Sequence, residues 1–306
     1  MTKKQRYANL DQIDNTKSFQ DFRRWQKERR SKKKDLSTHI EQSPYKESLR
    51  LKENRSAPSI TWIGHSTFLI QLNGLNLLTD PVWAHRMGFQ KRLTEPGMPL
   101  SDLPEIDIVL ISHGHYDHLD FPTIKKLKGN PTFYVPIGLG RAFKKRGYQK
   151  VIEANWYDSL EQGNLKLSFV PAQHWTKRSL TDTNSSHWGG WMIENKQQSI
   201  YFVGDTGYFR GFQDIAEKFK IDIVLMPIGA YEPEWFMKDS HINPEDAVKA
   251  FLELNGATFI PMHYGTYRLA DDTGPEALAR LEAEWKKREL PSSHLKKMLI
   301  GESYWL

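Results

Sequence analysis

The feature that most constrains the fold is an apolar segment that runs directly into a cluster of histidines and aspartates. Residues 106–112, IDIVLIS, have the composition of a buried β-strand. His113, His115, Asp117 and His118 follow within six residues. Alternate side chains of an extended chain share a face, so we expect the first three to lie together. The loop that leaves the strand can turn His118 inward as well.

Each of these histidines alone would be interpreted as a hydrogen-bonded core or surface group. Burying all four polar side chains together is costly unless a cation compensates them. The segment therefore predicts a metal site at the end of a buried strand.

The remaining chain alternates between strand and helix patterns, which argues against an all-β sandwich and predicts an α/β protein. Asn73-Gly74 predicts a hairpin between the first two apolar runs. The predicted strand regions are 59–72, 75–81, 106–112, 131–136, 165–174, 189–194, 199–205, 221–230 and 257–265. The predicted helices are 121–129, 212–220, 243–256 and 274–290, and the last two have proline in the first turn.

We expect residues 1–57 to form a basic N-terminal extension and 58–306 to form the main domain. The extension contains 16 Lys or Arg against 8 Asp or Glu, whereas the whole chain has a net charge of +6. Phe19, Phe22 and Trp25 recur every three residues, which predicts an aromatic stripe on a basic helix. Such an arm could pack on the main domain or lie on an anionic membrane, and we expect no nucleic-acid partner.

The sequence contains no cysteine, which excludes disulfides and thiolate metal ligands and leaves imidazole and carboxylate as donors. The N-terminus lacks the apolar region of a secretory signal, and no run of 18 apolar residues occurs. We therefore expect a cytoplasmic protein, with peripheral attachment to the inner face of a membrane as the alternative.

Several phrases in order resemble one branch of a known superfamily. The H-x-H-x-D-H run resembles the signature of the metallo-β-lactamase superfamily. The longer context resembles N-acyl-phosphatidylethanolamine-hydrolysing phospholipase D and its bacterial relatives, from about Ser59 to the C-terminus. The phrases that carry the resemblance are TWIGHS (61–66), LTDP (78–81), ISHGHYDHLD (111–120), QHW (173–175), GDTG (204–207) and PIGAYEP (227–233). This resemblance implies an αββα four-layer sandwich, with 58–306 as a hydrolase domain of the metallo-β-lactamase type.

The resemblance also implies a dinuclear metal centre. His174, Asp205 and His263 each follow a predicted strand and match the family's downstream ligands. One ion would be bound by His113, His115 and His174, the other by Asp117, His118 and His263, and Asp205 would bridge them. Imidazole and carboxylate ligands favour two zinc ions, with manganese or iron as alternatives.

Other residues have two interpretations each. Asp80 is either a carboxylate that orients a ligating histidine or a turn residue before proline. His241 could orient substrate or donate a proton, or it caps the following helix. His65 recurs in the family without an assigned role. The aromatic loop 231–238 could line a lipid groove or pack on the core, as could Trp175, Trp188 and Trp191.

The resemblance implies hydrolysis of a phospholipid at its distal phosphodiester. Two ions about 3.5–4 Å apart would generate a bridging hydroxide that attacks phosphorus. Asp205, Asp117 and His241 are the candidate catalytic residues, with Asp205 as proton acceptor and His241 assisting the leaving alkoxide. The alternatives are a lactonase or phosphodiesterase for soluble substrates and, from another class, a non-catalytic metal- or membrane-binding module. The sequence leaves a homodimer open.

Overall fold

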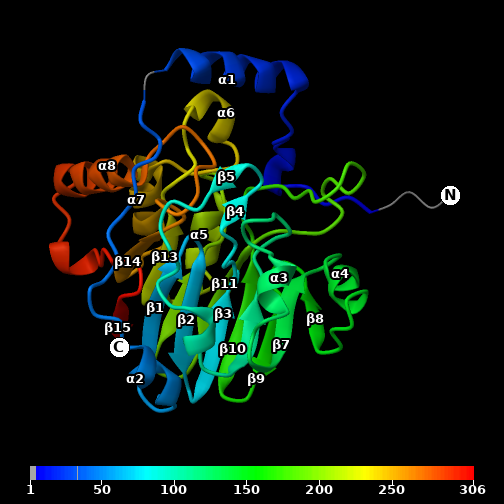
Figure 1. Cartoon of the computed structure of the whole chain (residues 1–306), viewed down its shortest axis with the longest axis vertical. Coiled ribbons are helices and arrows are strands. Elements are labelled where there is room, and N and C mark those ends of the chain that lie inside the picture. The colour runs from blue at the N-terminus through cyan, green and yellow to red at the C-terminus, as the bar shows by residue number, and fades with distance from the viewer. Residues whose placement is uncertain (1–4, 33) are drawn as a thin grey trace.

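The computed structural model describes residues 5–32 and 34–306, which form two β-sheets packed face to face with helices on both outer sides (Figure 1). The predicted αββα architecture is therefore confirmed. The first sheet consists, in spatial order, of β15 (Ser303–Trp305), β1 (Ser59–Gly64), β2 (Thr67–Leu72), β3 (Leu75–Thr79), β6 (Ile106–Leu110), β7 (Gly129–Pro136) and β8 (Val151–Ala154). The second consists of β14 (Thr258–Met262), β13 (Ile223–Pro227), β12 (Ser199–Phe202), β11 (Gly190–Glu194), β10 (Leu165–Val170) and β9 (Ser159–Gln162).

Helices cover the outer face of each sheet. The helices are α1 (Phe19–Ser31), α2 (Ser48–Glu53), α3 (Phe121–Ile124), α4 (Gly140–Lys144), α5 (Gly211–Ala216), α6 (Glu234–Met237), α7 (Pro244–Glu253) and α8 (Gly274–Lys287). Of these, α1 and α6 lie beyond one end of the strands (Figure 1). Short 3₁₀ turns lie at η1 (Leu10–Gln12), η2 (Leu100–Asp102) and η3 (Ser292–His294), and β4 (Arg86–Met87) pairs with β5 (Gln90–Lys91) in a small hairpin. Among the described residues, no helix combines the length and apolarity that crossing a bilayer requires.

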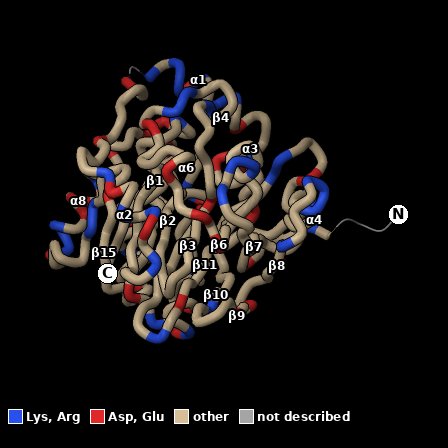
Figure 2. The backbone as a smooth tube through the Cα atoms, turned by 60° about the horizontal axis from the view of Figure 1, so that its bottom comes forward, with Lys and Arg blue, Asp and Glu red and all other residues tan. Residues whose placement is uncertain are grey.

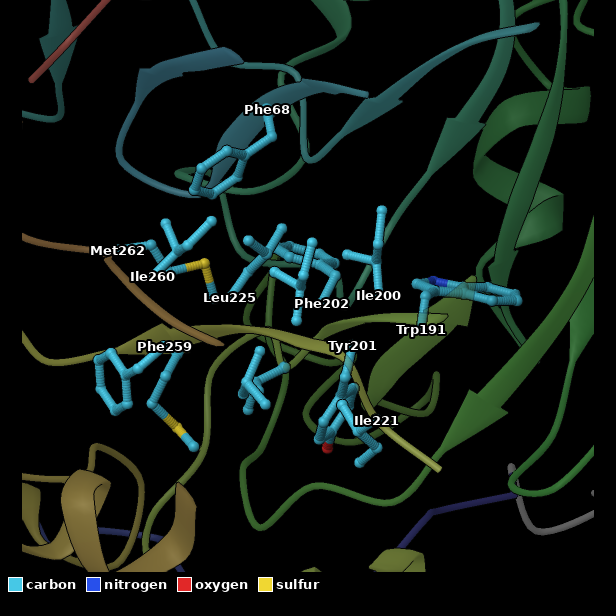
Figure 3. Close-up of a cluster of buried hydrophobic side chains, with 14 of the residues drawn as sticks. Phe68, Trp191, Ile200, Tyr201, Phe202, Ile221, Leu225, Phe259, Ile260 and Met262 are labelled. Carbon is cyan, nitrogen blue, oxygen red and sulfur yellow. The ribbon is translucent and has the colours of Figure 1, made fainter. Parts of the chain in front are cut away.

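The four layers arise because successive side chains of a strand point to opposite faces of its sheet. On β12, Ile200 and Phe202 point toward Phe68 of the first sheet, whereas Tyr201 between them points toward the helices (Figure 3). Both faces of the strand are thus buried, which is why three hydrophobic residues follow one another after Ser199. Asn73 and Gly74 adopt positive φ angles in the predicted hairpin between β2 and β3.

The prediction of one uninterrupted run over 59–72 is wrong. The run is divided into antiparallel strands β1 and β2 by a tight turn at His65-Ser66, where Gly64 has φ +127° and His65 has φ +54°. Helices α3 and α5 end earlier than their patterns predicted, and the short strands β8, β9 and β15 were missed. Those strands are partly exposed, so they lack a strong apolar signal.

The N-terminal extension packs on the main domain through α1. Trp25 is buried, its ring centre lies 5.0 Å from that of Phe236, and its Nε1 donates to Asp271 Oδ2 at 2.9 Å. Phe19 remains 74% exposed and Phe22 45% exposed, so only one member of the predicted stripe is buried. Lys and Arg residues occur along this helix, as the blue stretches of the backbone tube show (Figure 2).

Candidate metal centre

Strand direction brings the predicted site residues to one edge of the molecule. β3 and β6 are parallel in the first sheet, and β10, β12 and β14 run in the same direction in the second. Each of these five strands ends just before a predicted site residue or segment. Carboxyl ends of parallel strands share a sheet edge, so loops from both sheets converge there. The side chains that follow are Asp80, His113, His115, Asp117, His118, His174, Asp205 and His263.

The first predicted ligand group is compact. His113 Nε2 lies 2.8 Å from His115 Nδ1, and His174 Nε2 lies 3.2 Å from the same atom. His113 and His174 are buried. Adjacent ligands of a tetrahedral zinc ion with Zn–N bonds near 2.05 Å are about 3.3 Å apart, so this spacing suits a shared cation.

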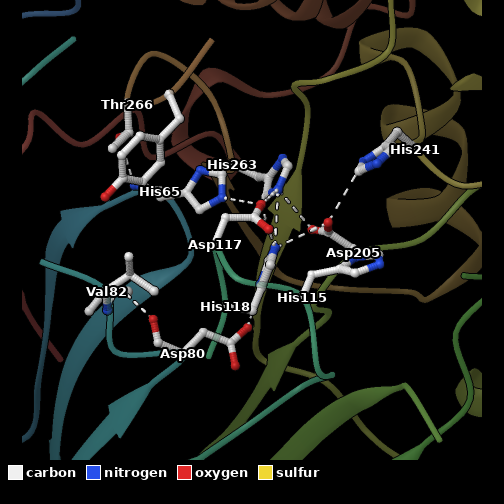
Figure 4. Close-up of polar contacts among 12 residues, drawn as sticks. His65, Asp80, Val82, His115, Asp117, His118, Asp205, His241, His263 and Thr266 are labelled. Carbon is white, nitrogen blue, oxygen red and sulfur yellow. Dashed lines mark hydrogen bonds and ion pairs between the residues drawn. The ribbon is translucent and has the colours of Figure 1, made fainter. Parts of the chain in front are cut away.

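The second predicted group lies beside the first (Figure 4). His118 Nε2 is 3.3 Å from Asp117 Oδ2 and 3.3 Å from His263 Nε2. Asp205 approaches both groups: its Oδ2 is 3.1 Å from His118 Nε2 and 3.8 Å from His174 Nε2. The structure therefore brings all seven predicted ligands together, with Asp205 between the two groups.

The electrostatics of the cluster favour a cation. Burial alone would raise the carboxyl pKa values, but the positive charges of His118 and His263 hold the pKa of Asp205 well below its usual range. The pKa of Asp117 is held down in the same way, chiefly by His118. In return these carboxylates, against the effect of burial, raise the pKa of His118 strongly and that of His263 to about 9. Protons on these rings thus balance two buried negative charges, and a divalent cation would displace them.

The donor set also fits a metal by its chemistry. His115 presents Nδ1 to the first group, 2.8 Å from His113 Nε2 and 3.2 Å from His174 Nε2. Burial lowers the pKa of His115 to about 4, so the ring is neutral at pH 7 and has a free lone pair. The residues present can therefore hold divalent cations through imidazole and carboxylate alone.

Residues behind the ligands fix ring orientations. Asp80 Oδ2 lies 2.7 Å from His118 Nδ1, which assigns the Asp80 carboxylate to orienting a histidine. His65 Nε2 lies 3.0 Å from Asp117 Oδ2, and its backbone N donates to Thr266 Oγ1 at 2.8 Å (Figure 4). His65 thus contacts a predicted ligand, a role that the sequence did not reveal.

Arg178 is a supporting residue that the sequence analysis missed. Its Nη1 donates to the backbone oxygens of Gly114 at 2.7 Å, Leu119 at 3.0 Å and His115 at 3.3 Å. One guanidinium therefore holds the loop that carries four predicted ligands. Arg178 lies four residues after His174 in the sequence, but it belongs to no recognisable motif that would have predicted this role.

A pocket of about 930 Å³ opens over the cluster. His115, Asp117, Asp205 and His241 reach it from the cluster side. Its apolar lining includes Phe22, Trp25, Trp175, Phe236, Met237 and Leu269, and its cationic lining includes Lys17, Arg86 and Lys177. Trp175 therefore belongs to the pocket, whereas Trp188 and Trp191 are core residues. The aromatic loop 231–238 also contributes to both: Tyr231 is buried in the core, whereas Phe236 lines the pocket.

His241 lies beside the cluster, with Nδ1 3.8 Å from Asp205 Oδ2. Together with His174 and Asp205 it forms a further group that could hold a cation. Burial lowers the pKa of His241 to about 4, so the ring is neutral at pH 7. The neutral ring carries a single N–H and lines the pocket.

The fold and the cluster define a metal-dependent hydrolase of the αββα type. Residues 75–264, more than half of the chain, match the β-lactamase superfamily domain. The chain belongs to the metallo-β-lactamase superfamily.

Two relatives of this chain are named as hydrolases. The chain is 41% identical over 226 residues to N-acyl-phosphatidylethanolamine-hydrolyzing phospholipase D 1 of Caenorhabditis elegans, which covers 68% of this chain and 64% of that protein. It is 31% identical over 212 residues to a metal-dependent hydrolase of Methanopyrus kandleri, which covers 68% of this chain and 84% of that protein. The chain thus matches a little under two thirds of the nematode protein's length.

A solved structure shows the same fold. The isothiocyanate hydrolase from Delia radicum gut bacteria superposes with a TM-score of 0.66 at 19% identity, covering 80% of this chain and 98% of that one. At this level of identity the likeness concerns the fold alone.

Proposed function

We propose that this hydrolase is a phosphodiesterase of the phospholipase D type that acts on phosphatidylethanolamine or its N-acyl form. The observation that carries the proposal is the pocket, which combines an apolar wall with cationic side chains directly over the histidine–aspartate cluster. An apolar wall suits acyl chains, and Arg86 and Lys177 suit a phosphate. The 41% identity to the nematode phospholipase D supports the same substrate class.

The reaction adds water across one bond. The water oxygen bonds to phosphorus, and the bond from phosphorus to the ethanolamine oxygen breaks. Phosphatidic acid and ethanolamine, or N-acylethanolamine, leave. Two divalent ions held by the seven ligand residues would supply Lewis acidity and lower the pKa of a water molecule.

The chain's own side chains handle the proton and the orientation. Asp205 lies between both ligand groups, with Oδ2 3.1 Å from His118 Nε2 and 3.8 Å from His174 Nε2, so its carboxylate can hold the proton that the attacking water loses. That proton then passes to the leaving alkoxide. Asp117, held by His65, fixes the opposite side of the cluster. His241 donates its N–H to the leaving oxygen and thereby orients it.

A peripheral membrane contact belongs to the same proposal. Phe89, at the tip of the β4–β5 hairpin, is 97% exposed, and Leu180, in the loop after Trp175, is 93% exposed. Phe19 of α1 adds a third exposed apolar side chain. Arg86, Met87 and Lys177, their sequence neighbours, line the pocket. Apolar tips flanked by cations suit the interface of an anionic bilayer.

The test uses zinc-loaded full-length protein and vesicles of phosphatidylethanolamine with and without the N-acyl form. Products are identified by mass in ¹⁸O-labelled water, with Asp205→Asn as the inactive control. Phosphatidic acid carrying one ¹⁸O supports attack on phosphorus. Label in the ethanolamine product, or turnover confined to lactones and soluble diesters, would contradict the proposal.

A further inference from the structure

The N-terminal arm, defined here as residues 5–18, runs beside the metal cluster before α1 begins. At one end it is fixed to the loop that follows Trp175. Arg6 Nη2 donates to the backbone oxygen of Thr181 at 2.8 Å, and Tyr7 stacks on His187 with ring centres 4.7 Å apart. The arm therefore has a defined path over the domain.

Asn9 joins this arm to a predicted ligand. It is only 6% exposed, and its Oδ1 accepts hydrogen bonds from the backbone N of His174 at 3.0 Å and from Trp188 Nε1 at 2.9 Å. Its Nδ2 donates to the backbone oxygen of Ile13 at 3.0 Å. Two donors face one side of the amide and an acceptor faces the other, so the orientation of the Asn9 side chain is fixed.

The arm also supports the residue on the other side of the same histidine. His174 Nδ1 donates to the backbone oxygen of Ser240 at 2.9 Å. The preceding residue, Asp239, is held twice by the arm: Asn15 Nδ2 donates to its backbone oxygen at 2.7 Å, and Lys17 Nζ lies 2.8 Å from its Oδ2. Both the backbone and the ring of His174 thus depend on segments that the arm contacts.

We infer that Asn9 is a positioning residue for the metal centre and that the arm is a working part of the site. This inference goes beyond the proposed function, because it concerns cation binding and holds for any substrate. The arm lies outside the family match over residues 75–264. Loss of a partner that orients a ligating histidine typically weakens metal binding about 10- to 100-fold.

The experiment measures zinc stoichiometry and affinity by chelator competition on full-length variants. Asn9→Leu keeps the size of the side chain but removes the acceptor. Asn9→Asp keeps an oxygen for both donors and gives up only the contact to Ile13. Asp11→Asn, which weakens the exposed ion pair between Asp11 and Arg210, is the matched control in the same arm.

We expect Asn9→Leu to weaken one zinc equivalent about tenfold or more and to leave the other near its wild-type affinity. Asn9→Asp should recover most of the loss, and Asp11→Asn should bind as wild type does. A folded Asn9→Leu protein that binds both equivalents normally would overturn the inference, as would an equal loss in Asp11→Asn.

A milder variant covers the case in which Asn9→Leu does not fold. Asn9→Ser keeps a polar group that is one bond too short to reach the His174 amide, and the same weakening of one equivalent is expected. Normal affinity in folded Asn9→Ser would equally overturn the inference. No lipid is needed for any of these measurements, so a failure here is distinct from a failure to hydrolyse phospholipid.

Discussion

Asp80 Oδ2 lies 2.7 Å from His118 Nδ1, and both side chains are completely buried. The same oxygen accepts a hydrogen bond from Ser112 Oγ at 2.5 Å, and Ser112 Oγ lies 2.9 Å from His113 Nδ1. One carboxylate therefore orients a histidine of each predicted ligand group, directly in one case and through a hydroxyl in the other. In both rings this leaves Nε2 facing the cluster.

This relationship predicts that Asp80→Asn weakens the binding of both zinc equivalents by about 10- to 100-fold. The amide cannot accept from His118 and Ser112 with the strength of a carboxylate. Chelator competition on the folded protein measures the effect, and the exposed Asp35→Asn is the matched control. If zinc affinity falls only for the equivalent bound by His118, the link from Asp80 through the Ser112 hydroxyl to His113 contributes nothing to metal binding.

The sequence could predict the ligands and one support, Asp80, but not the supports Asn9 and Arg178. His113 to His118 form one local pattern after an apolar strand, and His174, Asp205 and His263 also follow predicted strands, so strand direction alone brings them to one edge. Asn9 and Arg178 carry no such signal, because their contacts are fixed by folding. Asn9 meets His174 across 165 residues, and Arg178 meets Gly114 across 64. An isolated asparagine in a polar arm looks like any solvated residue until the chain has folded.

The Arg178 contacts predict a loop that loosens when the guanidinium is removed. Arg178→Ala leaves three backbone oxygens without their charged donor, and we expect the free energy of unfolding to fall by about 2 kcal/mol. Hydrogen exchange over residues 113–120 should become faster, and zinc affinity should fall. Lysine offers a point charge in place of the planar guanidinium, so Arg178→Lys should have an unfolding free energy and a zinc affinity between those of wild type and Arg178→Ala. Exchange unchanged relative to the exposed Arg23→Ala control would argue against this role.

The exposed tips Phe89 and Leu180 predict a change that depends on the form of the substrate. Phe89→Asp and Leu180→Asp place a charge where an acyl interface is expected, so turnover of vesicle phospholipid should fall several-fold. Turnover of a short-chain monomeric phospholipid should not change, because the cluster is untouched. Leu49→Asp, 70% exposed on α2 at the end of the molecule away from α1, is the matched control (Figure 1). Equal loss on both substrates would contradict a membrane role for these side chains.

His187 predicts a pH dependence of folding that is separate from the metal cluster. Its ring is buried between Tyr7 of the arm and Trp156, with centres 4.7 Å and 4.1 Å away, and its Nδ1 has no hydrogen-bond partner. Burial lowers the pKa of His187 to about 3 in the folded protein, whereas the ordinary value is 6.5. The unfolded chain therefore takes up a proton as the pH falls through 6.5, and the folded chain does not until about pH 3.

Between pH 6.5 and pH 3, protonation of His187 in the unfolded chain should therefore lower the free energy of unfolding by about 1.4 kcal/mol for each pH unit of acidification. Above pH 6.5 the ring is neutral in both states, and this loss of stability disappears. His187→Phe keeps the aromatic stack and removes the titration. Urea unfolding at pH 7, 6 and 5 in one zinc-containing buffer should give wild type a steeper decline in unfolding free energy than His187→Phe. The exposed His294→Phe controls for the loss of a surface histidine. If the free energy of unfolding declines equally in wild type and His187→Phe, the His187 ring must be protonated in the folded state. The stack of Tyr7, His187 and Trp156 would then not be the dry contact that fixes the start of the arm.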